Sequence, residues 1–214
     1  MASAKLVARI KEETGKDISA FNLKNPDDVS MIHSLLSDVY GLIDANERNV
    51  FKGIATAAPD RKPNLLFDVT MKDIKKLKSI AANAEKLGYN KENIHLVWVM
   101  NDVKVAMKQN KDRDRVVPDQ ILVGTHTGAA STMADILNMG DALKQYMDGD
   151  IWITFNKRGV DSKIEQSKAG GMYVVDSKYI QVKKKGQKSK TVADLSKDLV
   201  AKIKDYAPKS ASFE

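Results

Sequence analysis

Two arginines one residue apart, Arg113 and Arg115, stand in the stretch KQNKDRDRVVPDQI, between two more apolar segments. Residues at positions i and i+2 do not share a face of an α-helix, so in a helix these side chains would diverge. In an irregular loop, both guanidinium groups can converge on one anion, and each can hold two phosphate oxygens at once. Asp112 and Asp114 flank the arginines. The pattern therefore indicates either a phosphate-binding loop or a solvated charged loop.

Further polar side chains follow three short apolar runs, at residues 64–69, 94–100 and 150–156. Nearly unbroken apolarity is typical of strands buried on both faces, as in a parallel sheet. The carboxyl ends of parallel strands meet at one edge of the sheet, where ligands bind. Polar groups of this kind suit a phosphate group and its Mg²⁺. The residues expected at this edge are Asp68 and Thr70 after the first run, Asn101 and Asp102 after the second, and Asn156, Lys157 and Arg158 after the third.

The first two runs are separated by a segment with helical spacing of apolar residues, which begins near Asp73 and ends at Gly88. Thr70 and Asp73 have the spacing of a capping box. The order strand, helix, strand has the length of a right-handed βαβ crossover. Asp68 has an alternative interpretation, as a cap of the helix that follows it.

The remaining elements predict an α/β fold with a parallel-sheet core, a C-terminal β-hairpin and flanking helices. The hairpin is expected to pair residues 170–176 with 178–185 around Asp176 and Ser177. The chain is expected to divide into an N-terminal helical segment (1–62), a core with the arginine loop (63–160), and a hairpin with a last helix (161–214). Spacing and capping signals predict further helices at residues 26–43, 45–58, 103–109, 119–139 and 192–206.

Composition narrows the class of protein. The 214 residues include no cysteine, which excludes disulfides and thiolate metal sites, and the chain reads as cytoplasmic. No apolar run approaches the ~20 residues of a membrane span, so we expect no membrane contact. Three histidines, His33, His95 and His126, lie far apart and show no metal-ligand spacing, so no protein metal site is predicted.

The formal net charge of +7 fits phosphate-bearing ligands or nucleic acid without setting specificity. Part of this charge comes from a lysine cluster without interleaved acids or aromatic residues, which is more typical of a solvated loop than of a nucleic-acid site. The cluster consists of Lys183, Lys184, Lys185, Lys188 and Lys190.

The ordered set NLLFDVT, helix, IHLVWVMND, helix, NKDRDRVVP and a helix that starts with DQIL resembles the C-terminal two-thirds of a P-loop kinase of the zeta-toxin type. The likeness extends to kinase-like proteins of tailed bacteriophages, and it covers residues 64–156. It implies a P-loop-kinase-like core, ATP or GTP with Mg²⁺ as cofactor, and a phosphorylated small molecule or nucleotide as ligand. A phage-encoded protein of this kind would act in the host cytoplasm.

The resemblance also implies roles for single residues. Asp68 would end the strand that carries the Walker-B acid. Arg113 and Arg115 would form the lid that closes over the transferred phosphate. Asn156 and Lys157, with Arg158 beside them, would line the nucleotide.

One motif of the family is missing. A working kinase of this type needs G-x-x-x-x-G-K-[ST], whose backbone amides cradle the phosphates. The stretch GTHTGAAST has glycines and hydroxyls but no lysine. In the family, the strand before this loop lies between those that match 64–69 and 94–100. The chain is therefore expected to lack the first strand of its core, either because a P-loop segment precedes it or because the fold has been repurposed.

Two functions from different classes follow. The first is the lid and base-binding part of a nucleotide-dependent phosphotransferase, inactive as this chain alone. The alternative is a non-catalytic phage structural or interaction protein derived from a kinase fold. A third and weaker possibility is nucleic-acid binding through the lysine cluster, which a steep salt dependence would reveal.

Overall fold

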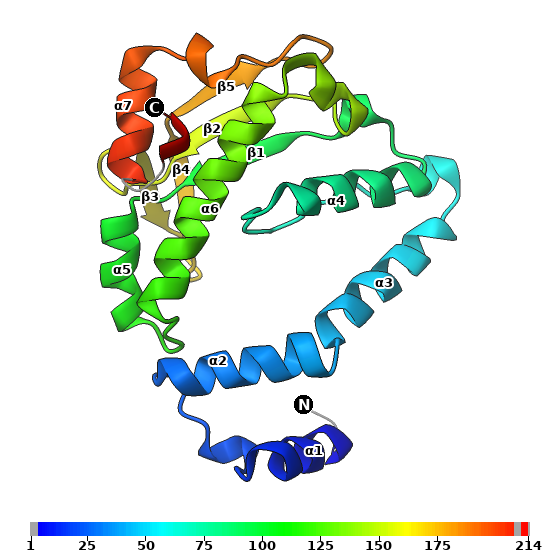
Figure 1. The fold of residues 1–214 in the computed structure, drawn as a ribbon, viewed down its shortest axis with the longest axis vertical. Coiled ribbons are helices and arrows are strands. Elements are labelled where there is room, and N and C mark those ends of the chain that lie inside the picture. The colour runs from blue at the N-terminus through cyan, green and yellow to red at the C-terminus, as the bar shows by residue number, and fades with distance from the viewer. Residues whose placement is uncertain (1–3, 208–210, 214) are drawn as a thin grey trace. The chain divides into compact units, whose positions relative to one another are not determined.

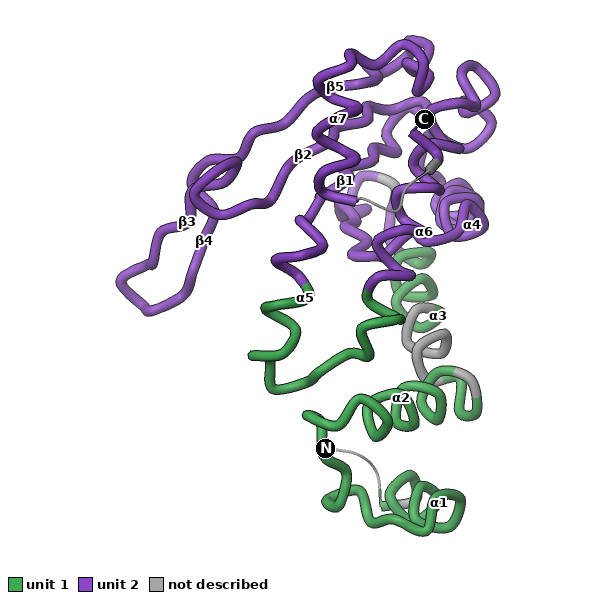
Figure 2. Tube along the Cα trace, turned by 60° about the vertical axis from the view of Figure 1, so that its left-hand side comes forward, with its two compact units in different colours: residues 1–56, 107–122 green, residues 57–106, 123–214 purple. Residues whose placement is uncertain are grey.

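The structure is a computed structural model that describes residues 4–207 and 211–213 (Figure 1). The chain forms two compact units (Figure 2). Unit 1 contains residues 1–56 and 107–122, and unit 2 contains residues 57–106 and 123–214. The arginine loop, which the sequence groups with the segment 63–160, therefore clusters with the N-terminal helices.

Unit 1 is built on three helices, α1 (Ala4–Thr14), α2 (Pro26–Ser34) and α3 (Leu42–Ala55). The helix predicted to begin at residue 26 is present, and Asn25 caps it, because its side-chain oxygen accepts a hydrogen bond from the amide of Asp27 at 3.0 Å. The predicted helix at 26–43 is interrupted by a π-helical turn, after which Gly41 has a φ of +57°. The small core of the unit comprises Ile10, Phe21 and Leu35, with Leu6, Ile32 and Tyr40 packed against it.

Unit 2 contains a mixed three-stranded sheet in the order β1-β2-β5. Strands β1 (Leu96–Met100) and β2 (Ile151–Phe155) are parallel, and β5 (Tyr179–Lys183) is antiparallel to β2. The second and third predicted strands thus form a parallel pair, as expected. The segment that connects them contains α5 (Val103–Asp112) and α6 (Asp119–Asn138).

The prediction of a strand at residues 64–69 is wrong. These residues pair with no strand, and the side chain of Leu66 is 96% exposed. Leu65, Phe67 and Val69 are half-buried and alternate with exposed neighbours, so the segment buries one face only. It leads into α4 (Ile74–Lys86), and Lys62 just before it donates a hydrogen bond to the carbonyl of Leu87. A short apolar run does not distinguish such a segment from a strand buried on both faces.

The predicted hairpin has the wrong partner. Strand β4 (Met172–Ser177) pairs with β3 (Ser162–Gln166), whereas β5 joins β2 in the main sheet. The turn of the observed hairpin uses Gly170 at a φ of +86°, and the amide of Ser167 donates to the carbonyl of Gly171 at 2.7 Å. Glycine adopts positive φ without steric cost, so this turn forms more readily than one at Asp176 and Ser177.

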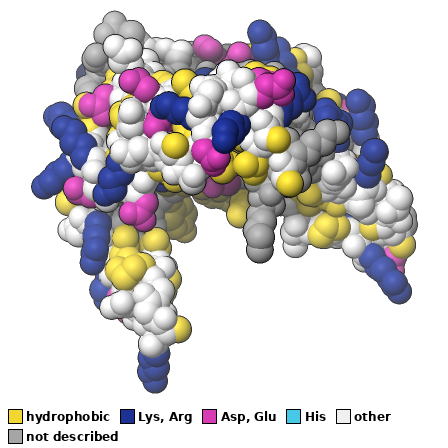
Figure 3. Space-filling view, turned by 90° about the horizontal axis from the view of Figure 1, so that it is seen from below, with side chains coloured by type: hydrophobic (Ala, Val, Ile, Leu, Met, Phe, Trp, Pro, Cys, Tyr) yellow, Lys and Arg dark blue, Asp and Glu magenta, His cyan; other side chains and the backbone are white. Residues whose placement is uncertain are grey.

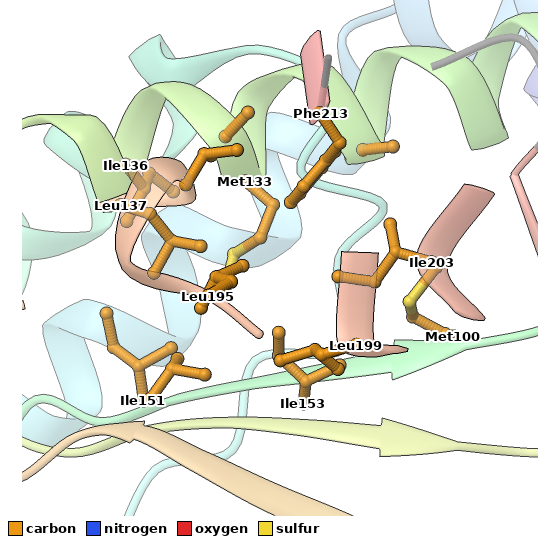
Figure 4. Close-up of a cluster of buried hydrophobic side chains, with 14 of the residues drawn as sticks. Met100, Met133, Ile136, Leu137, Ile151, Ile153, Leu195, Leu199, Ile203 and Phe213 are labelled. Atoms are coloured by element: carbon orange, nitrogen blue, oxygen red, sulfur yellow. The ribbon is translucent and has the colours of Figure 1, made fainter. Parts of the chain in front are cut away.

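The core of unit 2 lies between the sheet and two helices, α6 and α7 (Lys197–Tyr206) (Figure 4). Side chains from α6, α7 and β2 point toward one another there, and the fully buried ones include Ile136, Ile153 and Ile203. The predicted last helix is shorter than expected, because Ser196 caps α7 and a separate 3-10 turn precedes it. The 3-10 turns are Ile18–Ala20, Pro59–Arg61, Lys91–Asn93, Gly140–Gln145, Val192–Asp194 and Ala211–Phe213. Within residues 4–207 and 211–213, no helix is long and apolar enough to span a bilayer.

Candidate functional site

The carboxyl ends of β1 and β2 bring two predicted site residues together. The amide of Asn156 donates to the carbonyl of Met100 at 2.9 Å and so extends the parallel pairing by one residue. The side-chain nitrogen Nδ2 of Asn156 donates to Oδ1 of Asn101 at 2.9 Å. Ser162, which begins β3, donates its hydroxyl to Oδ1 of Asn156 at 3.3 Å. Both asparagines are exposed, so their amide groups form a polar rim at this edge of the sheet.

Directly beside this rim, Asp102 and Lys157 form an ion pair with 2.7 Å between Oδ2 and Nζ. Oδ1 of Asp102 caps α5, accepting hydrogen bonds from the amides of Lys104 and Val105 at 2.9 and 3.2 Å. Burial of Asp102 would by itself raise its pKa, but the hydrogen bonds from Lys157, Val105 and Lys104 hold the pKa below its ordinary value. The same hydrogen bond to Asp102 raises the pKa of Lys157. The pair is therefore ionised at neutral pH, and the charge of Lys157 is already balanced.

Magnesium does not fit Asp102, because both of its carboxylate oxygens have partners within the chain. Asp68 and Thr70 are exposed and follow no strand. Across the described residues, no group of three or more His, Asp or Glu side chains is placed to hold a metal ion.

The loop that carries Asn156 and Lys157 is fastened to α7 by Asp161, a residue that the sequence analysis missed. The carboxylate of Asp161 is buried and accepts hydrogen bonds from the ammonium group of Lys202 and the hydroxyl of Tyr206. No local pattern marks this residue, because its partners lie more than 40 positions away. Asp161 is best explained as an anchor that fixes the loop after β2.

Arg158 lies in the same loop but points to a different environment. It is exposed and lines an open cleft of about 320 Å³ with Lys163 and Lys178. Asp176 also lines this cleft, so its charge is mixed. Arg158 thus lines this cleft, whereas Asn101 and Asn156, which form the amide rim, do not.

Arg113 and Arg115 lie between the end of α5 and the start of α6, in unit 1. Both are exposed, as predicted, and among the described residues neither guanidinium group forms an ion pair or hydrogen bond. The flanking acids Asp112 and Asp114 are exposed as well. Exposure of both arginines is thus confirmed, and their action as a lid stays a prediction.

Asn110 closes the arginine loop and was not found from sequence. Its side chain is 1% exposed and makes two hydrogen bonds to the backbone of Val117. Nδ2 donates to the Val117 carbonyl at 2.6 Å, and Oδ1 accepts from the Val117 amide at 3.0 Å. An asparagine amide can donate and accept at once, so it can replace a pair of backbone groups. The signal in the sequence is an asparagine at the end of a predicted helix, just before a charged loop.

The lysine cluster is only partly available to an anion. Lys183 is 2% exposed, and its ammonium group donates to the carboxylate of Asp148 at 2.9 Å and to the carbonyl of Gly149 at 3.0 Å. Lys185 donates to Oδ1 of Asn93 at 2.9 Å and lies 3.4 Å from a carboxylate oxygen of Glu92. Two members of the cluster therefore serve the fold. The exposed members that form no direct ion pair with a described acid are Lys184, Lys188 and Lys190, and the last two act on the carboxylate of Asp194 at longer range.

The molecular surface shows no single basic field on the face drawn in Figure 3, where lysine and arginine side chains are scattered among acidic and apolar ones. No family model, curated protein or solved structure matches the chain. The family resemblance therefore stays a prediction, and the structure itself defines a mixed α/β protein with a small mixed sheet and a hairpin.

Proposed function

We propose that the chain is the lid and base-binding part of a nucleotide-dependent phosphotransferase, and that it binds phosphate groups through Arg113 and Arg115. The observation that supports this most directly is the exposure of two unpaired guanidinium groups within three residues of one loop. Surface arginines commonly form weak pairs with neighbouring acids. Here Asp112 and Asp114 are adjacent in sequence, yet neither pairs with the arginines.

The amide rim supports a base-binding role. Asn101 accepts a hydrogen bond from Asn156, which leaves the NH₂ group of Asn101 exposed as a donor. Asparagine side chains read the donor and acceptor pattern of nucleobases through such amide groups. The neutralised Lys157 beside them adds no net charge, which suits an uncharged base better than a phosphate.

We expect no catalysis by this chain alone. The phosphate-binding loop of P-loop kinases supplies most of the amides and the lysine that contact the β- and γ-phosphates, and the sequence has no such motif. We therefore expect weak binding of nucleotide without phosphate transfer. At 1 mM ligand, a site with a Kd near 1 mM stabilises the fold by about 0.4 kcal/mol.

Isothermal titration with Mg-ATP tests the proposal. We expect a dissociation constant in the millimolar range, and loss of the signal in a double variant, Arg113→Ala with Arg115→Ala. A matched control, Arg61→Ala with Lys168→Ala, removes the same charge from exposed positions elsewhere and should bind like the wild type. Equal loss in both double variants would show a non-specific charge effect and refute the assignment.

A non-catalytic interaction protein is the second candidate, and the hairpin β3–β4 favours it. Four consecutive residues of β4, from Met172 to Val175, are exposed although all are apolar. Isolated two-stranded hairpins are at best marginally stable in water, and large exposed apolar patches mark interaction sites. Sedimentation velocity over a hundredfold range of concentration tests self-association, which Val174→Lys should reduce. A monomer at all concentrations would remove self-assembly as the reason for this surface.

A further inference from the structure

The arginine loop has a closed base. Asn110 lies in the last turn of α5, just before the loop, and Val117 lies near the end of the loop, so the two hydrogen bonds between them bridge the six residues 111–116. The side-chain amide of Asn110 thus bonds to the N–H and C=O groups of Val117 as the backbone of a neighbouring β-strand would. Because Asn110 is 1% exposed, water does not compete for these bonds.

A second contact fixes the same end of the loop within unit 1. The amide of Val116 donates to the carbonyl of Leu23 at 2.9 Å. The segment that carries Leu23 is itself held by the buried carboxylate of Asp28, which accepts from the amide of Asn22 and the ammonium group of Lys16, each at 2.8 Å. The arginine loop therefore rests on a hydrogen-bonded segment of the N-terminal helices.

Closure of the loop affects what its arginines can bind. Residues at i and i+2 have Cα atoms no more than about 7 Å apart, so the two guanidinium forks can reach neighbouring phosphate groups of one chain. A loop whose ends are free would lose conformational entropy on binding, whereas a closed loop has already lost part of it. Each guanidinium group can donate two parallel hydrogen bonds to phosphate oxygens, so two arginines match several linked phosphate groups better than a single phosphate group.

We propose that Asn110 is a positioning residue that pre-organises Arg113 and Arg115 for a ligand with two or more linked phosphate groups. The inference rests on the proposed function, since it deepens the role of the arginine loop. Asn110 touches no ligand in this scheme. It acts by holding the backbone of Val117, and thereby the path of the loop.

The test uses the full chain and two readouts, titration with tripolyphosphate and hydrogen exchange at the amide of Val117. For Asn110→Ala we expect faster exchange of this amide and binding weakened by about tenfold, equivalent to ~1.4 kcal/mol. Inorganic phosphate should bind more weakly than tripolyphosphate to the wild type and should lose less in the variant. Gln109→Ala, a neighbouring exposed position in α5, should change neither readout.

A second variant removes the donor of the side chain and keeps its acceptor. In Asn110→Asp the side chain keeps its size and its acceptor oxygen, but a carboxylate oxygen takes the place of the NH₂ group that donates to the Val117 carbonyl. This variant should therefore also bind tripolyphosphate more weakly. Circular dichroism establishes that each variant is folded before it is titrated.

The outcomes separate the two proposals. If exchange at Val117 rises in Asn110→Ala while tripolyphosphate binds as before, and the double arginine variant loses binding, the positioning role is refuted and the proposed function stands. If exchange does not change, the closure itself is refuted. If the double arginine variant binds tripolyphosphate like the wild type, the phosphate-binding role of the loop fails, and the inference fails with it.

Discussion

Substitution of Asp102 probes the ion pair at the strand ends, because Asp102 has two separable tasks. One oxygen accepts from the ammonium group of Lys157, and the other caps α5. Asp102→Asn keeps an oxygen for the cap but loses the charge. A hydrogen bond to a charged group contributes about 1.5–3 kcal/mol. Since the Lys157 side chain is one-third exposed and can turn to water, we expect the lower end, about 1.5 kcal/mol.

Asp102→Ala removes the cap as well, which costs about 1 kcal/mol more, for a total near 2.5 kcal/mol. Urea denaturation at pH 7, followed by circular dichroism, measures both differences in the free energy of unfolding. Asp141→Asn is the matched control, because Asp141 is exposed and its contact with Lys144 is 3.5 Å long. An exposed pair of this kind contributes at most about 0.5 kcal/mol.

The pH dependence provides a further check. The folded state lowers the pKa of Asp102, so its contribution is complete above the unfolded pKa, near 3.9, and is lost as the pH falls through the lower folded value. The difference between the wild type and Asp102→Asn should therefore shrink between pH 5 and strongly acidic pH. A difference that is absent at pH 7, or the same at pH 7 and pH 2.5, would refute this reasoning.

Two further predictions use matched neighbours. Gly128→Ala should destabilise the fold, because the added Cβ would lie 3.0 Å from the Cβ atom and 3.2 Å from the carbonyl oxygen of Lys72. In Gly124→Ala the added Cβ meets nothing within 4 Å, so this variant should stabilise α6 by up to about 1 kcal/mol. Melting temperatures that shift in the same direction in both variants would contradict the contact with Lys72. Lys183→Met should lower the free energy of unfolding by about 3–5 kcal/mol, because the carboxylate of Asp148 and several carbonyls lose their buried donor. Lys184→Met, at an exposed neighbouring position, should be near neutral, and urea denaturation of both variants measures the difference.

Local patterns predicted those parts of the fold that depend on nearby residues. The helix that begins at residue 26 and the strand β2 were both predicted from a few consecutive positions, and the structure has both. The capping residue of α4 is Asp73 itself, whose side chain accepts from the amide of Lys75 at 2.8 Å, rather than the expected pair with Thr70. Helix caps and strands of this kind can be predicted from neighbouring residues, without the rest of the chain.

The failures share a dependence on distant partners. Leu65 and its neighbours have the apolarity of a buried strand, but whether a strand lies beside them is decided elsewhere in the chain. The partner of β4 depends on which of two turns has the lower free energy, and the turn at Gly170 is the one that forms. Lys183 sits in a lysine-rich stretch, and only the position of Asp148 reveals that it is structural. Asn110 was missed for the same reason, because its role appears only when both ends of the loop are known.

The unit boundaries have a practical consequence for dividing the protein. Two of the three passages between the units fall inside helices, within α5 after residue 106 and within α6 after residue 122. Proteases need an extended, accessible backbone, so these hydrogen-bonded peptides should resist cleavage. The third passage follows α3 at residues 56–57, in a turn. A protease nick there would give the fragments 1–56 and 57–214, and the first would stay attached only through non-covalent contacts within unit 1, such as the hydrogen bond between Val116 and Leu23. Recombinant expression of either unit alone would require cutting through α5 and α6.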